Sequence, residues 1–209
     1  MRVRDIGRCP VGAKTQNCAT SSLLSQGSRV TRIFLTLSVV GTMFGLIALL
    51  MGFNIGDAAA RDAAVQTSVS RHMLAGLGGL CFAALVHAIV FTYFMGTGRW
   101  IEETSRVYSL GNGFHQANQK IKYQLLPLIM ASVLMLVSTG GFGAFSDPLR
   151  GVKPTEWAGM AHMLVAITAL LLNLATNLKE FALIERNGMI IKDVLGEVRR
   201  IRVEKGLPD

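Results

Sequence analysis

The chain is poor in charged residues, and those it has are absent from four long stretches. Only 16% of its 209 residues are Asp, Glu, Lys or Arg, whereas ordinary soluble domains contain about 25%. No such residue occurs in 33–56, 72–98, 123–146 or 157–178. Each stretch exceeds the roughly 18 apolar residues that indicate a membrane span. The pattern excludes an ordinary soluble domain and predicts four transmembrane helices.

Cysteine is also scarce, and its spacing excludes most cysteine chemistry. The three cysteines are Cys9, Cys18 and Cys81, and their spacing matches neither a zinc-binding nor a redox pattern. Cys81 lies inside the second charge-free stretch, where we expect it to pack as a small apolar residue. A Ser-His-Asp order, a glycine-rich phosphate loop and a pair of carboxylates are lacking as well. These absences disfavour an enzyme.

The fold class that follows is all-α, an integral membrane four-helix bundle with helical cytoplasmic extensions. We expect spans at about 33–54, 73–97, 124–145 and 157–178, within a membrane domain of residues 30–183. The apolar part of the first span is longer than the core of a signal peptide, which has about 7–15 residues. We therefore interpret it as a true span.

Lysine and arginine concentrate in alternate loops, which predicts the orientation of the chain. Six precede the first span, four lie between the second and third, and seven follow the fourth, whereas each remaining loop has two. Because cytoplasmic loops carry such an excess, we expect both termini in the cytoplasm, in a bacterial plasma membrane. Topology and anionic lipid headgroups then account for the net charge of +8. We expect no nucleic-acid partner.

The segments outside the spans are predicted to lie in the cytoplasm. Residues 1–29 contain a single acid and are expected to form a disordered tail. The Gly-Asn-Gly sequence at 111–113 predicts a turn, so the second and third spans should form a long hairpin that projects from the membrane. Residues 184–209 are expected to form an amphipathic helix and tail after a break at the Asn-Gly pair at 187–188. This helix could lie on the inner leaflet, dock on the hairpin or bind a partner subunit.

Polar residues at membrane depth are the candidate functional residues, because the bilayer core disfavours them. At about 1.5 Å per helical residue, His87 lies roughly 21 Å below the outer end of the second span. The same count places polar residues of the other three spans at a similar depth. We predict an intramembrane polar layer of His87, Asn173, Ser132 and Thr42, with Ser38 as the alternative to Thr42.

A second level contains His72, at the outer end of the second span, and His162, a few residues inside the fourth. At about 100° per residue, each histidine shares a helical face with small residues: Gly76, Gly79, Ala83, Ala166 and Ala169. Imidazoles on facing helices could hold a b-type haem, with His72 and His162 as axial ligands. The alternative is that these small residues pack the second span against the fourth, with His87 bonded to Asn173.

Three functional hypotheses follow from these patterns. We favour a non-catalytic membrane subunit or scaffold that interacts through the cytoplasmic hairpin and the C-terminal helix. Besides the lipid bilayer, this role requires a protein partner or self-association through the C-terminal helix. The alternatives are a b-type haem electron carrier and a small channel or transporter with a polar layer around His87.

Overall fold

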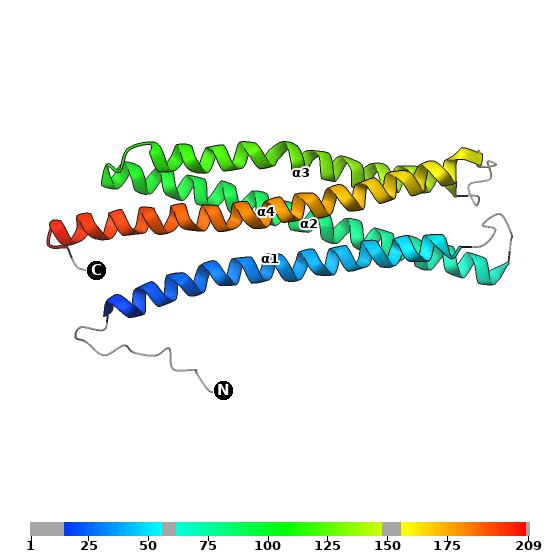
Figure 1. Ribbon diagram of the computed structural model, residues 1–209, viewed down its shortest axis with the longest axis horizontal. Helices are drawn as coiled ribbons and strands as arrows, with labels where there is room; N and C mark the ends of the chain where they lie inside the picture. Colours follow the sequence, from blue (N-terminus) through cyan, green and yellow to red (C-terminus); the bar gives the residue numbers. More distant parts are fainter. Residues whose placement is uncertain (1–14, 56–61, 148–155, 208–209) are drawn as a thin grey trace, which may run out of the picture.

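The fold consists of four long helices that run side by side (Figure 1). The computed structural model describes residues 15–55, 62–147 and 156–207, with side chains from residue 30 onward in the first range and from 157 onward in the last. No strand occurs in these residues. The helices are α1 (Thr15–Phe53), α2 (Ala63–Tyr108), α3 (Gly113–Ser146) and α4 (Glu156–Glu204). The predicted all-α bundle is confirmed.

The outer surface of the bundle is apolar over much of its length. All four helices contain a segment long and apolar enough to cross a membrane. Side chains such as Leu74, Leu134 and Leu171 are 61–71% exposed on the outside of the bundle, as expected where lipid replaces water. By length and composition the chain is a multi-pass membrane protein.

The helices form two hairpin-like pairs. α1 packs on α2 and α3 packs on α4, while α1 also contacts α4 and α2 also contacts α3. α2 and α4 meet across the centre, whereas α1 and α3 make no contact within the described residues. The pattern of contacts stays the same when α1 is exchanged with α3 and α2 with α4. The bundle therefore has an approximate two-fold arrangement, with α2 and α4 at its centre.

Glycines allow α1 and α2 to approach closely. A Cβ atom on Gly79 would lie 3.1 Å from the backbone nitrogen of Gly45, and one on Gly41 would lie 3.3 Å from the Cβ atom of Phe82. Small residues at such contacts allow membrane helices to approach within van der Waals distance of each other's backbone. The glycines of α1 and α2 thus form one shared contact.

This contact differs from the packing expected for the second span. Gly76 and Gly79 were expected to face Ala166 and Ala169 of α4, but both lie against α1, where a Cβ atom on Gly76 would be 3.9 Å from that of Ala48. A helical face of small residues shows which side is packed but not which neighbour covers it. The complementary glycines of α1 explain why that helix is the neighbour.

Three helices continue beyond the membrane segments and pack together. We name this part the stalk, comprising residues 99–122 of α2 and α3 and residues 184–204 of α4. Ile101, Ile121 and Val194 are at most 1% exposed, so the stalk has a core of its own. The predicted hairpin is present, with the left-handed Ser109 ending α2 and Gly111 in the turn at a φ of 77°.

α4 has no break at residues 187–188. It runs without interruption to Glu204, so the predicted break is wrong. The physical reason is that Asn187 is fully buried and makes side-chain hydrogen bonds to α2 and α3, which hold it inside the helix. Of the three arrangements considered for the C-terminal helix, the structure has it docked on the hairpin of α2 and α3.

Two further local expectations differ from the structure. α1 begins at Thr15, so residues 15–29 are helical, whereas a disordered tail was expected; residues 1–14 lie outside the described residues. Cys81 is exposed on the outside of α2 and is not packed in the bundle. Its face of α2 points away from the other helices, as Leu77 and Leu85 do.

Candidate functional site

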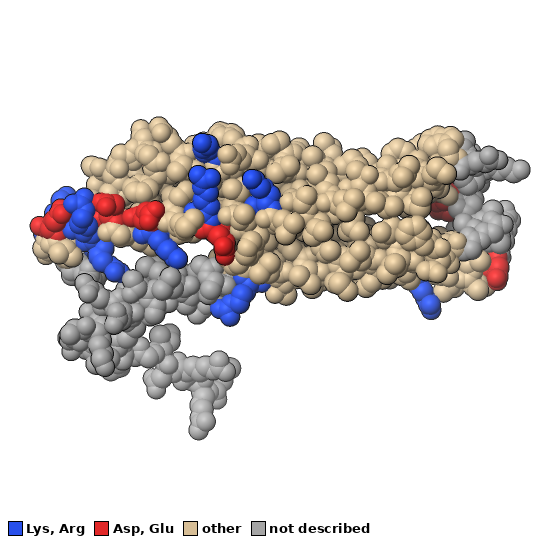
Figure 2. All heavy atoms as spheres, viewed as in Figure 1, with Lys and Arg blue, Asp and Glu red and all other residues tan. Residues whose placement is uncertain are grey.

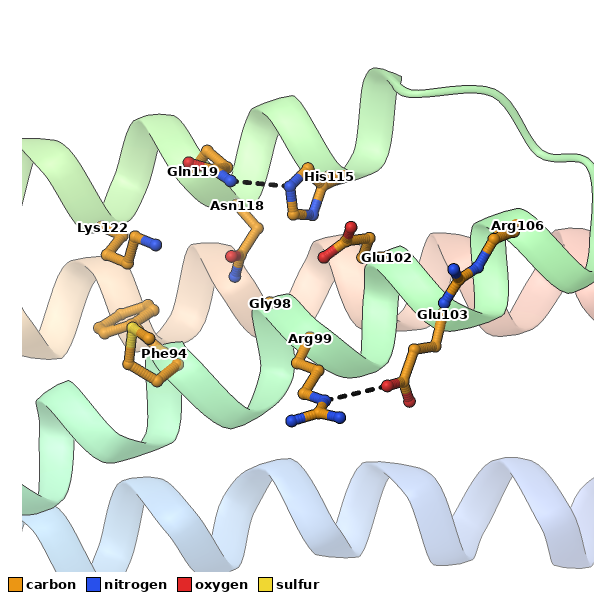
Figure 3. A pocket seen from close by; sticks show the side chains of 11 residues that line it. Phe94, Gly98, Arg99, Glu102, Glu103, Arg106, His115, Asn118, Gln119 and Lys122 are labelled. Atoms are coloured by element: carbon orange, nitrogen blue, oxygen red, sulfur yellow. Dashed lines mark hydrogen bonds and ion pairs between the residues drawn. The ribbon is translucent and has the colours of Figure 1, made fainter.

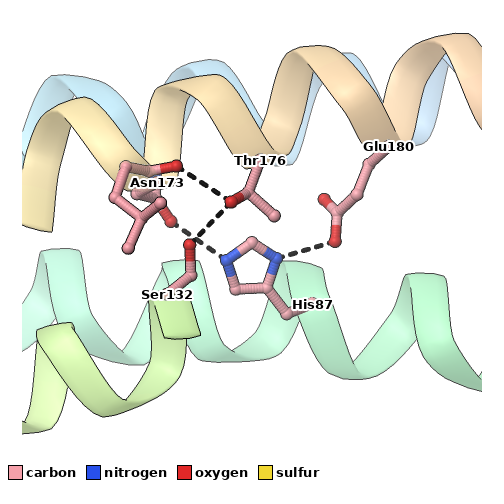
Figure 4. Close-up of polar contacts among 6 residues, drawn as sticks. His87, Ser132, Asn173, Thr176 and Glu180 are labelled. Atoms are coloured by element: carbon pink, nitrogen blue, oxygen red, sulfur yellow. Dashed lines mark hydrogen bonds and ion pairs between the residues drawn. The ribbon is translucent and has the colours of Figure 1, made fainter. Parts of the chain in front are cut away.

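A buried ion pair connects the two central helices (Figure 4). Nδ1 of His87 lies 2.7 Å from Oε1 of Glu180, and the two side chains are 1% and 0% exposed. Nε2 of His87 lies 3.1 Å from Oδ1 of Asn173, which is the contact that counting membrane depth predicts. The ring of His87 thus bridges Glu180 and Asn173, two residues on one face of α4, and both of its nitrogens have a partner.

A pair of hydroxyl groups joins α3 to the same part of α4. Ser132 and Thr176 are fully buried, and their hydroxyl oxygens lie 2.8 Å apart. The hydroxyl of Thr176 also donates to the carbonyl of Leu172 at 2.9 Å. Since that bond uses its only hydrogen, Ser132 is the donor between the two hydroxyls. α3 and α4 are thus tied by a neutral hydrogen bond next to the ion pair (Figure 4).

A second polar chain connects three helices where the membrane segments meet the stalk. The amide of Asn118 on α3 donates to Oδ1 of Asn187 on α4 at 2.8 Å. The amide of Asn187 donates in turn to the hydroxyl of Thr97 on α2 at 3.0 Å. That hydroxyl donates to the carbonyl of Tyr93 at 2.8 Å. Each donor in the chain has an acceptor, as buried polar groups require.

These contacts form one polar column along α4. Its buried polar residues recur at the spacing of one helical face: Asn173, Thr176, Asn177, Glu180 and Asn187. Oε2 of Glu180 and Oδ1 of Asn177 have no hydrogen-bond partner among the described residues. An unpaired buried oxygen is costly, so the described residues satisfy the column only in part.

The predicted polar layer is placed only in part by the structure. His87, Asn173 and Ser132 lie together in the column. Thr42 lies apart from it and donates to the carbonyl of Ser38 within α1 at 2.7 Å. The hydroxyl oxygen of Ser38 is buried without a partner among the described residues.

The acidic member of the pair, Glu180, was recognised in the sequence just beyond the small and polar face of the fourth span, but it was not predicted as the partner of His87. The span was ended at Leu178 because the next residue, Lys179, is charged. Glu180 nevertheless lies seven residues after Asn173 and thus on the same helical face. That spacing was the available signal.

The two outer histidines lie near each other at the end of the bundle opposite the stalk. The ring centroids of His72 and His162 are 6.0 Å apart and the ring planes are perpendicular. Nδ1 of His72 lies 2.9 Å from the carbonyl oxygen of Ala48 on α1, and Nδ1 of His162 lies 3.1 Å from that of Thr139 on α3. Both histidines begin a His-Met-Leu tripeptide, a short repeat that sequence reasoning missed.

A pocket of about 370 Å³ opens between α2 and α3 at the base of the stalk (Figure 3). Phe94 and Met95 form its apolar part, and charged side chains line the rest. The exposed Arg99 and Glu103 form an ion pair at 2.9 Å, and this hydrogen bond raises the pKa of Arg99 above its usual value. Because the lining has acids as well as bases, the pocket does not select a ligand of one charge.

Charge is distributed unevenly over the whole surface. Lysine, arginine and acidic side chains gather over the stalk end, while the middle of the visible face lacks them (Figure 2). Among the described residues no group of three or more His, Cys, Asp or Glu is placed to hold a metal ion. Comparisons with known protein families, curated proteins and solved structures find no match for the chain.

Proposed function

We propose that the chain is a non-catalytic membrane subunit that presents its stalk to a protein partner in the cytoplasm. The observation that carries the proposal is the stalk's own core, with Ile101, Ile121 and Val194 buried outside the membrane segments. A helical structure that packs beyond the bilayer has a fixed shape, and a fixed shape is what a docking platform needs. The excess of basic residues at this end supports its cytoplasmic location.

The outer part of the stalk supports a partner of mixed polarity. Val107, Val203 and Leu207 are 75%, 66% and 49% exposed in a region that would be in water. Charged residues surround them on the same helices. Apolar side chains within a polar rim are typical of protein interfaces.

Site-specific photocrosslinking in native membranes tests the proposal. A photoreactive side chain at Val107 or Val203 is expected to give a discrete protein adduct. The matched controls are Leu134 and Leu171, which are similarly exposed on the membrane segments and should give lipid adducts only. Copies with two different tags show whether the partner is a second copy of the chain. If neither stalk position yields a protein adduct, the proposal is wrong.

A second candidate function is the passage of a proton or small solute past His87. It is favoured by the buried pair of His87 and Glu180 and by the unpartnered Oε2 of that carboxylate, since ionisable groups inside membranes often mark such pathways. Flux into liposomes should then be lower with His87→Ala than with the unaltered chain. Equal flux would remove His87 from any pathway.

A further inference from the structure

The two outer histidines occupy equivalent places in the two halves of the bundle. His72 lies near the start of α2 and His162 near the start of α4, exactly 90 residues apart. Each ring nitrogen Nδ1 contacts a backbone carbonyl of the preceding helix, α1 or α3. Because α2 and α4 meet at the centre of the bundle, the approximate two-fold arrangement brings the two imidazoles next to each other, with perpendicular ring planes.

The carbonyl contacts determine which nitrogen carries the hydrogen. A carbonyl oxygen can only accept, so Nδ1 of His72 and Nδ1 of His162 both donate. In the neutral ring, Nε2 is then left with a free lone pair. Neither Nε2 has a hydrogen-bond partner among the described residues. A histidine that ligates a metal typically donates its other nitrogen to a carbonyl or carboxylate in this way.

A glycine leaves room for each ring. A Cβ atom on Gly52 would lie 3.1 Å from Cε1 of His72, and a Cβ atom on Gly143 would lie 3.1 Å from Cε1 of His162. Each glycine is four residues after the residue whose carbonyl accepts from that histidine. Each half therefore places its imidazole by the same two features, one hydrogen bond to a carbonyl and one glycine that leaves room for the ring.

We propose that Nε2 of His72 and Nε2 of His162 together bind one transition-metal ion. A metal ion about 2.0 Å from each of two imidazole nitrogens keeps the ring centroids about 6 Å apart when the two nitrogens lie on nearly opposite sides of the metal. The observed separation of 6.0 Å agrees with this near-linear arrangement. Each Nδ1 is held by a carbonyl, which leaves Nε2 as the ring nitrogen that can bind a metal ion.

The number of ligands restricts the metal. No third His, Cys, Asp or Glu joins the pair among the described residues, so a four-ligand structural zinc site is not formed there. Haem iron needs only two axial ligands, because the porphyrin supplies the other four. A copper ion also binds imidazole readily. The shared chemistry is bis-imidazole ligation, and haem or a free copper ion could supply the metal.

Titration of the purified full-length chain with hemin and, separately, with copper(I) tests the site. We expect one equivalent of one of them to bind. His72→Ala and His162→Ala should lower the affinity more than about a hundredfold, since even the partners of a ligand contribute about 10–100-fold. His115→Ala is the control, because His115 lies in the stalk and contacts Gln119.

The outcomes separate the sources and can overturn the site. A bis-imidazole haem spectrum identifies haem, and tight copper binding without it identifies a free ion. Free imidazole should restore binding to a His72→Gly chain, a rescue that a merely structural role would not give. The proposal is overturned if the folded chain, checked by size-exclusion chromatography and circular dichroism, binds neither metal. Unchanged affinity in both alanine variants would overturn it equally. Neither result bears on partner binding by the stalk, because the two regions lie at opposite ends of the bundle.

Discussion

Removal of one member of the His87–Glu180 pair should destabilise the bundle much more than removal of a neutral hydrogen bond beside it. The two side chains are 1% and 0% exposed and 2.7 Å apart. Glu180→Leu leaves the imidazole of His87 without its acidic partner, and breaking a buried pair in this way costs about 3–5 kcal/mol. Ser132→Ala removes one neutral interhelical bond, which is worth about 0.6 kcal/mol on average.

The double variant distinguishes the ion pair from simple packing. When both charged groups are replaced by apolar ones, no buried charge is left unpaired. His87→Leu with Glu180→Leu should therefore cost less than the sum of the single variants, with a coupling energy within the range of about 0.5–3 kcal/mol seen for contacting residues. The shape of Leu differs from that of His, so some loss from packing is expected to remain.

Reversible unfolding of the purified chain in mixed micelles, followed by circular dichroism, measures these free energies. The four chains to compare are the unaltered chain, the two single variants and the double variant, with Ser132→Ala as the neutral control. Additive costs in the double variant would refute the charge pairing. So would a cost for Glu180→Leu no larger than that for Ser132→Ala.

Two further predictions concern the glycines of α2 just before the stalk and the topology. Gly98→Ala should lower the free energy of unfolding by about 1–3 kcal/mol in the same assay, because the new Cβ atom would lie 2.5 Å from Oδ1 of Asn118. Gly96→Ala should instead raise it by about 0.5–1 kcal/mol, because the new atom has nothing within 4 Å. Equal changes in the free energy of unfolding for Gly98→Ala and Gly96→Ala would refute this reasoning. In a cysteine-free chain, Val107→Cys should react with an impermeant thiol reagent only from the cytoplasmic side and Gln66→Cys only from the outer side; the reverse labelling would refute the orientation.

The four helices could be predicted because a charge-free run is a local signal. The length of such a run can be compared directly with the thickness of a bilayer, whatever the rest of the fold is. The ends of the helices could not be predicted equally well. The pair at 187–188 has the composition of a helix end, and only the partners of Asn187 on two other helices keep α4 continuous.

The membrane depth of the site residues could be predicted, but the neighbouring helix that each side chain faces could not. Counting residues brought His87, Asn173 and Ser132 to one level, because the rise per residue of a helix is constant. It could not exclude Thr42, whose hydroxyl is satisfied within its own helix. It placed Glu180 just beyond the span and did not pair it with His87, because the span was ended at the charged Lys179, whereas the structure buries the carboxylate of Glu180 against His87.

The polar contacts are distributed unequally among the helices, and this implies an unequal attachment. α4 is bonded to α2 through His87 and Thr97, and to α3 through Ser132 and Asn118. α1 contributes the carbonyl of Ala48 to His72, and it packs on the bundle through its glycines, the buried Phe34 and the stacking of Phe44 on Phe82. Dispersion between closely packed helices has no direction and weakens steeply with separation, whereas buried polar bonds fix one register. Buried polar bonds therefore fix the register of α4 against α2 and α3, whereas α1 is held against α2 mainly by close apolar packing. Because His72 is held by α1, a metal bound between the outer histidines would fasten that helix to the rest.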